Sequence, residues 1–335
     1  MENSSTIEPL PDDDDDASHN TMTAATSDYD PSIAASSFCS VTSSVNGHVW
    51  EYGRRYQIFR YGRYPLPNDE EEFKRESLKH AMFKEVLHGE LFLAPVAPNA
   101  QKIIDLGTGF GDWAIEVGDA MPSAKVTGID LSPIQPVWLP PNVEFIVDDI
   151  EDDWTDGSDF DFVHSRVVFA CLKDPPKVID AAFRNLKAGG WIEFCEFFPV
   201  IGCDDATVRP DNALLRFYDL MRQAFLRQYG MDLTYIEKVP SQLEQTGFIN
   251  IQRKIYHLPV GDWPREKHLR TIGVYMREII DEMLAAMAAK PFTEAGMDKA
   301  EVNELLHSVR TVLRNKRIHA HLPAHIVWAQ KPPSA

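Results

Sequence analysis

A turn rich in glycine constrains the fold of this chain more than any other stretch of its sequence. The stretch IIDLGTGFGDW, residues 103–113, begins as an apolar strand that ends in Asp105, and Gly107, Gly109 and Gly111 follow. A strand that passes through such a turn into a helix starts a βαβ unit, and the glycines let the backbone come close to a ligand. The sequence therefore predicts a nucleotide-type ligand at the end of this strand.

Strand and helix patterns alternate around this turn, which predicts parallel strands joined by right-handed crossovers. After residue 198 the pattern changes to long amphipathic helices and two further strands. We therefore predict an α/β fold with one mostly parallel sheet, an N-terminal cap and a helical insertion. The predicted strands are 102–106, 125–129, 143–147, 160–164, 191–196, 249–257 and 321–329, and the predicted helices after the turn are 112–120, 176–186, 211–229, 241–246, 266–289 and 299–314.

Composition divides the chain into four segments. Residues 1–46 hold nine acidic residues and no Lys or Arg, which is half of the net charge of −18. With few large apolar groups, this segment cannot offset its ordering entropy, so we expect a disordered acidic tail. We expect residues 47–100 to form a cap or lid whose helix begins near Asp69, residues 101–200 to form the cofactor-binding core, and residues 201–335 to form a helical substrate-side insertion with the final strands.

The acidic balance and the absence of a long apolar run exclude several classes of function. A chain with net charge −18 repels phosphate backbones, so we expect no direct binding to nucleic acid. No apolar run approaches the roughly 18 residues that a membrane span needs, and the four cysteines show no CxxC spacing. We expect a protein of the cytoplasm with reduced thiols and no membrane partner.

The spacing of the glycines distinguishes between two cofactors. A dinucleotide site uses GxGxxG, but Asp112 stands where its third glycine would lie. Asp105 also precedes the turn, and a carboxylate there repels a pyrophosphate. S-adenosylmethionine has no phosphate and carries an ammonium and a positively charged sulfur. The pattern therefore favours S-adenosylmethionine.

Two further acids follow at strand ends, in the order that such a site requires. Asp130 ends the second strand of the core, where a carboxylate can accept hydrogen bonds from both ribose hydroxyls. Asp149, at the end of the third strand, lies where it can accept the adenine amino group. An acid at the position of Asp130 also occurs in NAD sites, so the three features favour S-adenosylmethionine only as a set.

Several motifs, taken in order, resemble those of class I S-adenosylmethionine-dependent methyltransferases: IIDLGTGFGDW, GIDLSP, FIVDDIEDDW, FDFVHSR and LKAGGWIEF. The flanking pieces YGRRYQIFRYGRYPLPNDEEE, LPVGDWP and VWAQKP resemble the fungal LaeA-like methyltransferases. The likeness covers about residues 47–333. It implies a Rossmann-like class I methyltransferase fold, whose mostly parallel sheet has an antiparallel last strand, with S-adenosylmethionine as the cofactor.

The resemblance also implies roles for single residues. It assigns Asp105, Gly107 and Gly109, with Gly111 closing the turn, to the methionine side of the cofactor. It assigns Asp130 to the ribose hydroxyls, and it assigns Asp149 and Ile150 to the adenine. The resemblance places Tyr52, Arg54 and Tyr56 in a lid over the cofactor, although these aromatics also suit plain packing.

His164 and Arg166, just past the fourth strand of the core, are the candidate catalytic residues. An imidazole titrates in the range that a general base needs, and Arg166 suits a carboxylate acceptor. A structural histidine is the competing interpretation of His164, and Glu196 is a weaker candidate because acids at strand ends often only cap them. Phe217, Tyr218 and Met221 on a later helix are candidates to line the acceptor pocket.

A metal site is not expected. The histidines of HAHLPAH, residues 319–325, have no cysteine or acidic cluster beside them in the sequence.

Two functions remain open from the sequence. The first is methyl transfer to an oxygen or nitrogen of a small molecule, as a tailoring step in fungal secondary metabolism. The alternative is a nuclear regulator of secondary metabolism that keeps the methyltransferase fold and acts through protein partners. The sequence has no Lys/Arg run typical of nuclear import, but an acidic tail suits an interaction segment.

Overall fold

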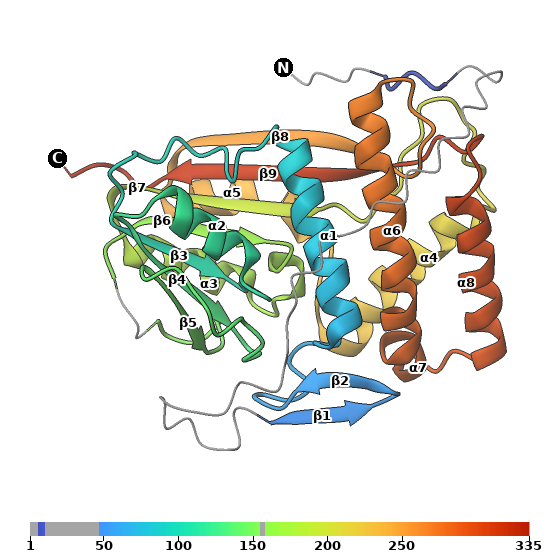
Figure 1. Ribbon diagram of the computed structural model, residues 1–335, viewed down its shortest axis with the longest axis horizontal. Coiled ribbons are helices and arrows are strands. Elements are labelled where there is room, and N and C mark those ends of the chain that lie inside the picture. Colours follow the sequence, from blue (N-terminus) through green and yellow to red (C-terminus); the bar gives the residue numbers. More distant parts are fainter. Residues whose placement is uncertain (1–5, 11–46, 155–157, 335) are drawn as a thin grey trace.

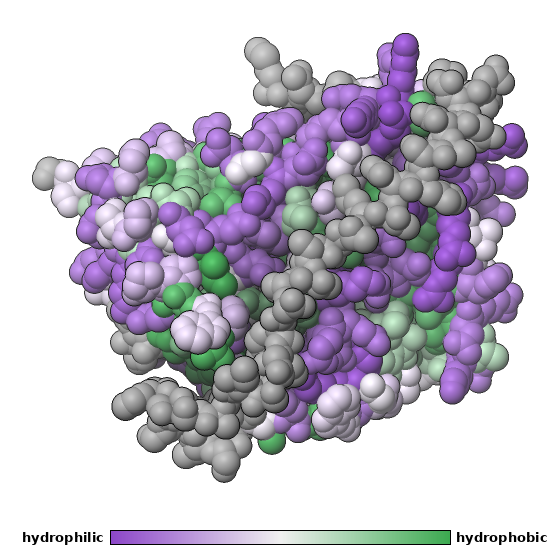
Figure 2. Space-filling model, viewed as in Figure 1, coloured by the Kyte–Doolittle hydropathy of each residue, from purple (hydrophilic) through white to green (hydrophobic). Residues whose placement is uncertain are grey.

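A computed structural model describes residues 6–10, 47–154 and 158–334 of the chain. Apart from residues 6–10, the predicted acidic tail lies outside the described residues, so its predicted disorder stays a prediction. Figure 2 shows one face of the molecule, which is largely hydrophilic with small separate groups of hydrophobic residues.

Seven strands form one central sheet in the order β5-β4-β3-β6-β7-β9-β8 (Figure 1). Strands β3 to β7 pair in parallel, whereas β9 runs antiparallel to both β7 and β8. This confirms the predicted sheet and its antiparallel last strand. The bounds are β3 Lys102–Leu106, β4 Lys125–Asp130, β5 Val143–Val147, β6 Phe160–Arg166, β7 Leu186–Phe197, β8 Ile249–Pro259 and β9 His321–Gln330.

One strand differs from its predicted bounds. The sequence predicts a turn at Lys187 to Gly190, but β7 already begins at Leu186, which pairs with Phe160. The pairing is irregular between Phe160 and Phe162, where β7 passes through Gly189 at a φ of +81°. A glycine-containing irregularity inside a strand resembles a turn in sequence, which explains the difference.

Helices cover both faces of the sheet, because alternate strand residues point to opposite sides. Ile103 packs on the face covered by α2, whereas Ile104 packs on the face covered by α3 and α5. Helices α1, α4, α6 and α8 pack around a third apolar cluster and form a helical layer at the side of the sheet (Figure 1). The bounds are α1 Glu70–Val86, α2 Asp112–Ala120, α3 Pro175–Asn185, α4 Ala213–Ala224, α5 Val239–Thr246, α6 Lys267–Ala289, α7 Pro291–Glu294 and α8 Lys299–Leu313.

A short hairpin precedes the helical layer and was not predicted. Strands β1 (His48–Glu51) and β2 (Arg54–Gln57) are joined by Tyr52 and Gly53, whose φ angles are +52° and +75°. Two central residues with positive φ are typical of a tight hairpin turn. Four-residue strands with mixed aromatic and charged side chains give too short an alternation for sequence periodicity to detect.

Helix α1 begins where the sequence predicts. Asp69 is the N-cap, and its Oδ1 accepts a hydrogen bond at 3.2 Å from the backbone N–H of Glu72. Three acids fill the first turn, where the helix dipole favours negative charge. The cap fixes where α1 begins, and one face of this helix lines the cavity described below.

Residues 8–10 lie along the loop that follows β8, a placement that the expectation of a disordered tail did not anticipate. The backbone N–H of Leu10 donates to the carbonyl of Trp263 at 2.8 Å, and that of Arg265 donates to the carbonyl of Glu8 at 2.8 Å. Pro9 and Pro264 pair as an isolated antiparallel bridge between these bonds.

Deleting residues 1–10 is expected to lower the free energy of unfolding by about 1–2 kcal/mol, because each such hydrogen bond contributes roughly 0.5–1.5 kcal/mol. Chemical denaturation of the shortened and the full chain measures this loss. Deleting residues 1–5 alone serves as the control and should change nothing. Equal stability of the two shortened chains would show that the contact with residues 263–265 contributes nothing.

No helix within the described part of the chain combines the length and the apolar character that crossing a membrane requires.

Candidate functional site

The glycine turn lies where β3 ends, at the carboxyl edge of the parallel strands. Gly109 adopts a φ of +59°, and a Cβ added there would meet nothing within 4 Å, so the turn leaves open space on its cavity side. Gly111 has a different purpose: it caps α2 at a φ of +88°, and a Cβ would lie 2.4 Å from the ring of Phe145. Gly107 and Gly109 line the cavity, whereas Gly111 allows α2 to pack closely against β5.

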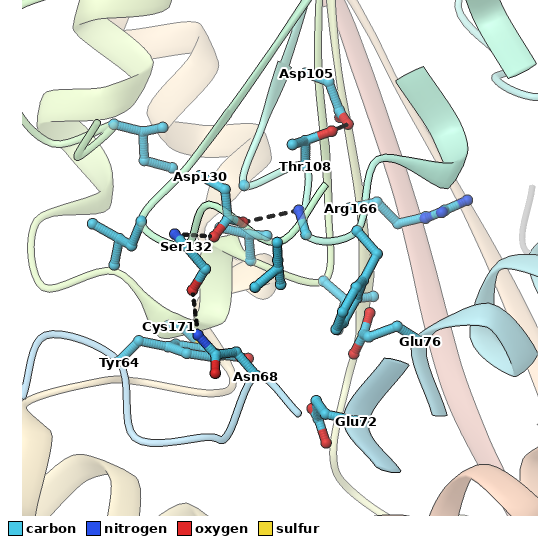
Figure 3. A pocket seen from close by; sticks show the side chains of 18 of the residues that line it. Tyr64, Asn68, Glu72, Glu76, Asp105, Thr108, Asp130, Ser132, Arg166 and Cys171 are labelled. Atoms are coloured by element: carbon cyan, nitrogen blue, oxygen red, sulfur yellow. Dashed lines mark hydrogen bonds between the residues drawn. The ribbon is translucent and has the colours of Figure 1, made fainter. Parts of the chain in front are cut away.

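The cavity beside the turn gathers most of the residues that the sequence singles out. It extends from the ends of β3, β4 and β6 to helix α1, as Figure 3 shows. Its walls include Tyr64, Asn68, Glu72, Glu76, Lys79, Asp105, Gly107, Gly109, Asp130, Asp149, Ile150, His164, Arg166 and Cys171.

The lining of this cavity is rich in negative charge. Six carboxyl side chains face three cationic ones, so the cavity favours a cationic ligand over a phosphate. The acids are Glu72, Glu76, Asp105, Asp130, Asp148 and Asp149, and the cations are Arg63, Lys79 and Arg166.

Asp130 connects the end of β4 to the glycine turn. Its Oδ2 accepts from the backbone N–H of Gly109 and its Oδ1 from that of Ser132, both at 2.8 Å (Figure 3). Burial raises the pKa of Asp130 to about 7, although these two N–H groups favour the charged form. The carboxylate therefore lies at the turn with both oxygens directed by the backbone, and its contact with the ribose stays a prediction.

Asp105 and His164 form a buried pair under the turn. The Asp105 Oδ1 lies 2.7 Å from His164 Nδ1, and its Oδ2 accepts from the Thr108 hydroxyl at 2.7 Å. The His164 ring stacks on Trp113 with a centroid distance of 3.6 Å and is 1% exposed. Burial lowers the pKa of His164, while Asp105 opposes this shift, so the neutral ring donates its Nδ1 proton to Asp105. This pair fixes the start of the glycine turn.

Arg166 and Glu196 both make contacts that support the fold. The Arg166 guanidinium donates to Nδ1 of His80 at 2.8 Å and lies over the Phe83 ring, pointing away from Asp130 (Figure 3). Glu196 accepts from the backbone N–H groups of Val168 and Phe169 at 2.8 and 2.7 Å, outside the cavity. Glu196 therefore orders the segment that follows β6.

The segment between β2 and α1 closes the far end of the cavity. Arg63 Nε lies 3.1 Å from Asp149 Oδ2 and also contacts Glu151. Asn68 Nδ2 donates to the Ser132 hydroxyl at 3.2 Å. The cap predicted from residues 47–100 thus reaches the cavity through residues 63–68.

The three residues predicted for the lid do not line the cavity, which corrects their assignment as cofactor contacts. Tyr52 is 48% exposed in the hairpin turn, and Arg54 pairs with Asp69 at 2.6 Å. Tyr56 is 1% exposed, with the Lys290 ammonium 5.0 Å from its ring centre. The hairpin directs Arg54 to the N-cap of α1 and Tyr56 to Lys290 before α7, so these two side chains hold the segment in place.

A second correction concerns the acceptor pocket. Phe217, Tyr218 and Met221 are buried in the core of the helical layer and do not line the cavity. The cavity wall comes from α1 instead, through Glu72, Glu76 and Lys79. Sequence reasoning missed these three because charges on a helix usually face water; their spacing of four and three residues, one helical face, was the available signal.

The histidines near the last strand form pairs. His321 Nδ1 lies 3.2 Å from His257 Nδ1, and His319 contacts Asp205. Within residues 6–10, 47–154 and 158–334, no group of three or more His, Cys, Asp or Glu side chains could hold a metal ion.

Comparisons with known proteins agree with this arrangement. A family profile described as "Methyltransferase domain" matches residues 78–255. The chain is 37% identical over 305 residues to "Methyltransferase pytC" of Aspergillus terreus, covering 90% of this chain and 94% of that protein. It is 36% identical over 295 residues to "Secondary metabolism regulator LAE1" of Cochliobolus heterostrophus, covering 86% and 96%. It is 32% identical over 285 residues to "Protein-methionine methyltransferase laeA" of Emericella nidulans, covering 84% and 76%.

The fold, the glycine turn and the family profile define a class I S-adenosylmethionine-dependent methyltransferase. At 37% identity over nine-tenths of its length to one relative, the chain belongs to the fungal LaeA-like methyltransferases.

The cofactor is S-adenosylmethionine, which supplies a methyl carbon on a positively charged sulfur. The cavity fits it on two grounds. Gly109 leaves open space at the turn, and carboxyl groups outnumber cationic groups six to three, which suits a ligand with ammonium and sulfonium charges.

Proposed function

We propose that the protein transfers a methyl group from S-adenosylmethionine to an oxygen or nitrogen of a small molecule, as a tailoring step in fungal secondary metabolism. The observation that carries this proposal is the cavity, which continues past the glycine turn to a second, polar wall on α1. In this proposal the acceptor lies against that wall, beside the cofactor. The relative named Methyltransferase pytC supports the same function.

In this proposal each end of the cofactor has its own residues. Asp105, Gly107 and Gly109 hold the methionine part, and Asp130 accepts the ribose hydroxyls. Asp149 and Ile150 contact the adenine, under the segment that Arg63 ties down. These residues orient the cofactor and exclude water, which is the main requirement of an in-line displacement at carbon.

We assign His164 a positioning role in place of the predicted general base. Its Nδ1 is bonded to Asp105, its ring stacks on Trp113, and it is 1% exposed. Arg166 likewise supports the wall through His80. In this role His164 holds Asp105 in place, and Arg166 holds His80 in place.

A second candidate function follows from the other relatives. Two of them are named for regulation of secondary metabolism and for methylation of protein methionine, and the chain covers 96% and 76% of their lengths. As a regulator the chain would act through protein partners, in the nucleus, with the same cofactor site. As a tailoring enzyme it would act in the cytoplasm.

Mass spectrometry of extracts from strains with and without the gene separates the two functions. For a tailoring enzyme we expect one compound to disappear, while a precursor lighter by one methylene, about 14 Da, accumulates because only one step of methyl transfer is lost. Loss of many unrelated metabolites together would contradict the tailoring step and establish the regulator.

A further inference from the structure

A charged wall, made of Glu72, Glu76 and Lys79, faces the cavity from α1. Figure 3 shows the carboxylates of Glu72 and Glu76 on one side of the cavity, with Tyr64 and Cys171 on the other. We call the part of the cavity between these two sides the slot; it belongs to the same cavity as the glycine turn, Asp130 and Asp149. The proposed roles give Asp130 to the ribose and Asp149 to the adenine, and they leave the slot to the acceptor.

Burying these charges is costly unless each one is compensated. Glu76 is compensated, because its Oε1 accepts from Lys79 at 2.7 Å and its Oε2 lies 2.6 Å from the same ammonium. Burial disfavours its charge, but Lys79 and Arg75 outweigh this and hold the pKa of Glu76 below its usual value. Glu76 and Lys79 therefore satisfy each other and leave little for a ligand.

Only one of the two carboxylate oxygens of Glu72 has a hydrogen-bond donor. Its Oε1 accepts from Arg75 Nε at 3.1 Å, whereas its Oε2 has no hydrogen-bond donor within the part of the chain that the structure describes. The residue is only 4% exposed, and it lines the cavity. A carboxylate oxygen that faces a cavity and has no donor from the protein is a site for a donor that a ligand supplies.

The charge of Glu72 specifies the kind of donor. Arg75 contacts Glu72 and Glu76, and Arg60 lies 3.6 Å from Asp149, so the net charge of the lining does not by itself select a cation. The oxygen without a donor belongs to a carboxylate, which binds a cationic donor more strongly than a neutral one and repels an anion.

We infer that Glu72 anchors the methyl acceptor through a protonated amine, in the slot between the charged wall and the side chains of Tyr64 and Cys171. This rests on the proposed function and specifies its substrate class as an amine-bearing small molecule. The ammonium donates to Glu72 Oε2, and the rest of the acceptor extends along the slot toward the glycine turn.

Two probes of the same shape test this site. Phenethylamine carries an ammonium where 2-phenylethanol carries a hydroxyl, and their dissociation constants can be measured by ligand-observed NMR on the full chain saturated with S-adenosylhomocysteine. We expect the amine to bind at least about tenfold more tightly, because both probes can donate a hydrogen bond to Glu72 but only the ammonium also forms an ion pair with it. Equal affinity of the two probes overturns the proposal.

Three variants locate the effect. Glu72→Gln should remove the preference for the amine, whereas the matched control Glu71→Gln, whose side chain is 68% exposed on the same helix, should keep it. Cys171→Phe should block both probes by filling the slot from the other side, and it replaces Glu72→Gln as the test if that variant does not fold. A preference that survives Glu72→Gln, or probe binding that survives Cys171→Phe, overturns the proposal.

S-adenosylhomocysteine binding by the unaltered chain is measured first. Its failure would overturn the proposed function, a result distinct from any outcome of the probe comparison.

Discussion

Asp130→Ala is expected to weaken the binding of S-adenosylhomocysteine by roughly 100-fold or more. The variant loses two hydrogen bonds from ribose hydroxyls to a carboxylate, each worth about 1.5–3 kcal/mol. It also removes the acceptor of the Gly109 N–H, which holds the glycine turn against β4. Isothermal titration calorimetry on the variant and the unaltered chain measures the loss.

The control for this prediction is Asp119→Ala, which makes the same change on the exposed side of α2. Its affinity for S-adenosylhomocysteine should match that of the unaltered chain. If Asp130→Ala also matched, Asp130 would not be the ribose acid.

The same carboxyl gives the affinity a pH dependence. Since burial raises the pKa of Asp130 to about 7, the group is largely protonated at pH 6 and ionised at pH 8. Only the ionised form accepts from both hydroxyls, so affinity should rise over this range, and Asp130→Asn should flatten the rise. Without ligand, the contribution of Asp130 to folding stability depends on pH in the opposite direction. The raised pKa stabilises the folded state at low pH, and this stabilisation is lost as pH rises through about 7.

His164→Ala is expected to lower the free energy of unfolding by about 3–5 kcal/mol, because it leaves the buried carboxylate of Asp105 without its donor and removes a buried ring. Asp105 is buried beneath the turn and would lose the donor that lies 2.7 Å from its Oδ1. The variant also loses the stacking on Trp113. Urea denaturation followed by circular dichroism measures the change.

The exposed histidine of α8, His307, provides the matched control. His307→Ala should change the stability by less than about 0.5 kcal/mol. A general base would behave differently: His164→Ala would then unfold as the unaltered chain does and would fail only in turnover. That outcome would contradict the positioning role.

Asp105, Asp130 and Asp149 all lie at or just after the ends of parallel strands. Asp105 and Asp130 belong to β3 and β4, Asp149 follows β5, and the carboxyl ends of parallel strands meet at one edge of a sheet. Local pattern and topology together therefore place them around one cavity, while their contacts with the cofactor stay a prediction. The antiparallel last strand, by contrast, was implied by the resemblance to the family and not by local pattern.

The rest depends on contacts between distant parts of the chain, which local pattern does not contain. Arg63 and Asp149 are 86 residues apart in the sequence, yet their side chains meet across the cavity. Nothing in the sequence distinguishes Arg63 from Arg54, which pairs with Asp69 instead. The lid was therefore predicted in the right segment but on the wrong side chains.

The burial of charged side chains was the other feature that the sequence did not predict. Glu72 and Lys79 are almost completely buried, although the sequence of their helix is typical of a charged helix that faces water. Only the packing of α1 between the sheet and α6 decides which of its charges lose water.

The placement of α1 has a consequence for how enzymes of this kind diverge. The groups assigned to the methyl donor belong to the strand ends and the glycine turn, whereas the charged side of the slot assigned to the acceptor belongs to one helix outside the sheet. Substitutions at positions 72, 76 and 79 can therefore change the accepted compound while leaving the donor machinery intact. Exchange of this single helix between related chains is a direct route to new methylated products.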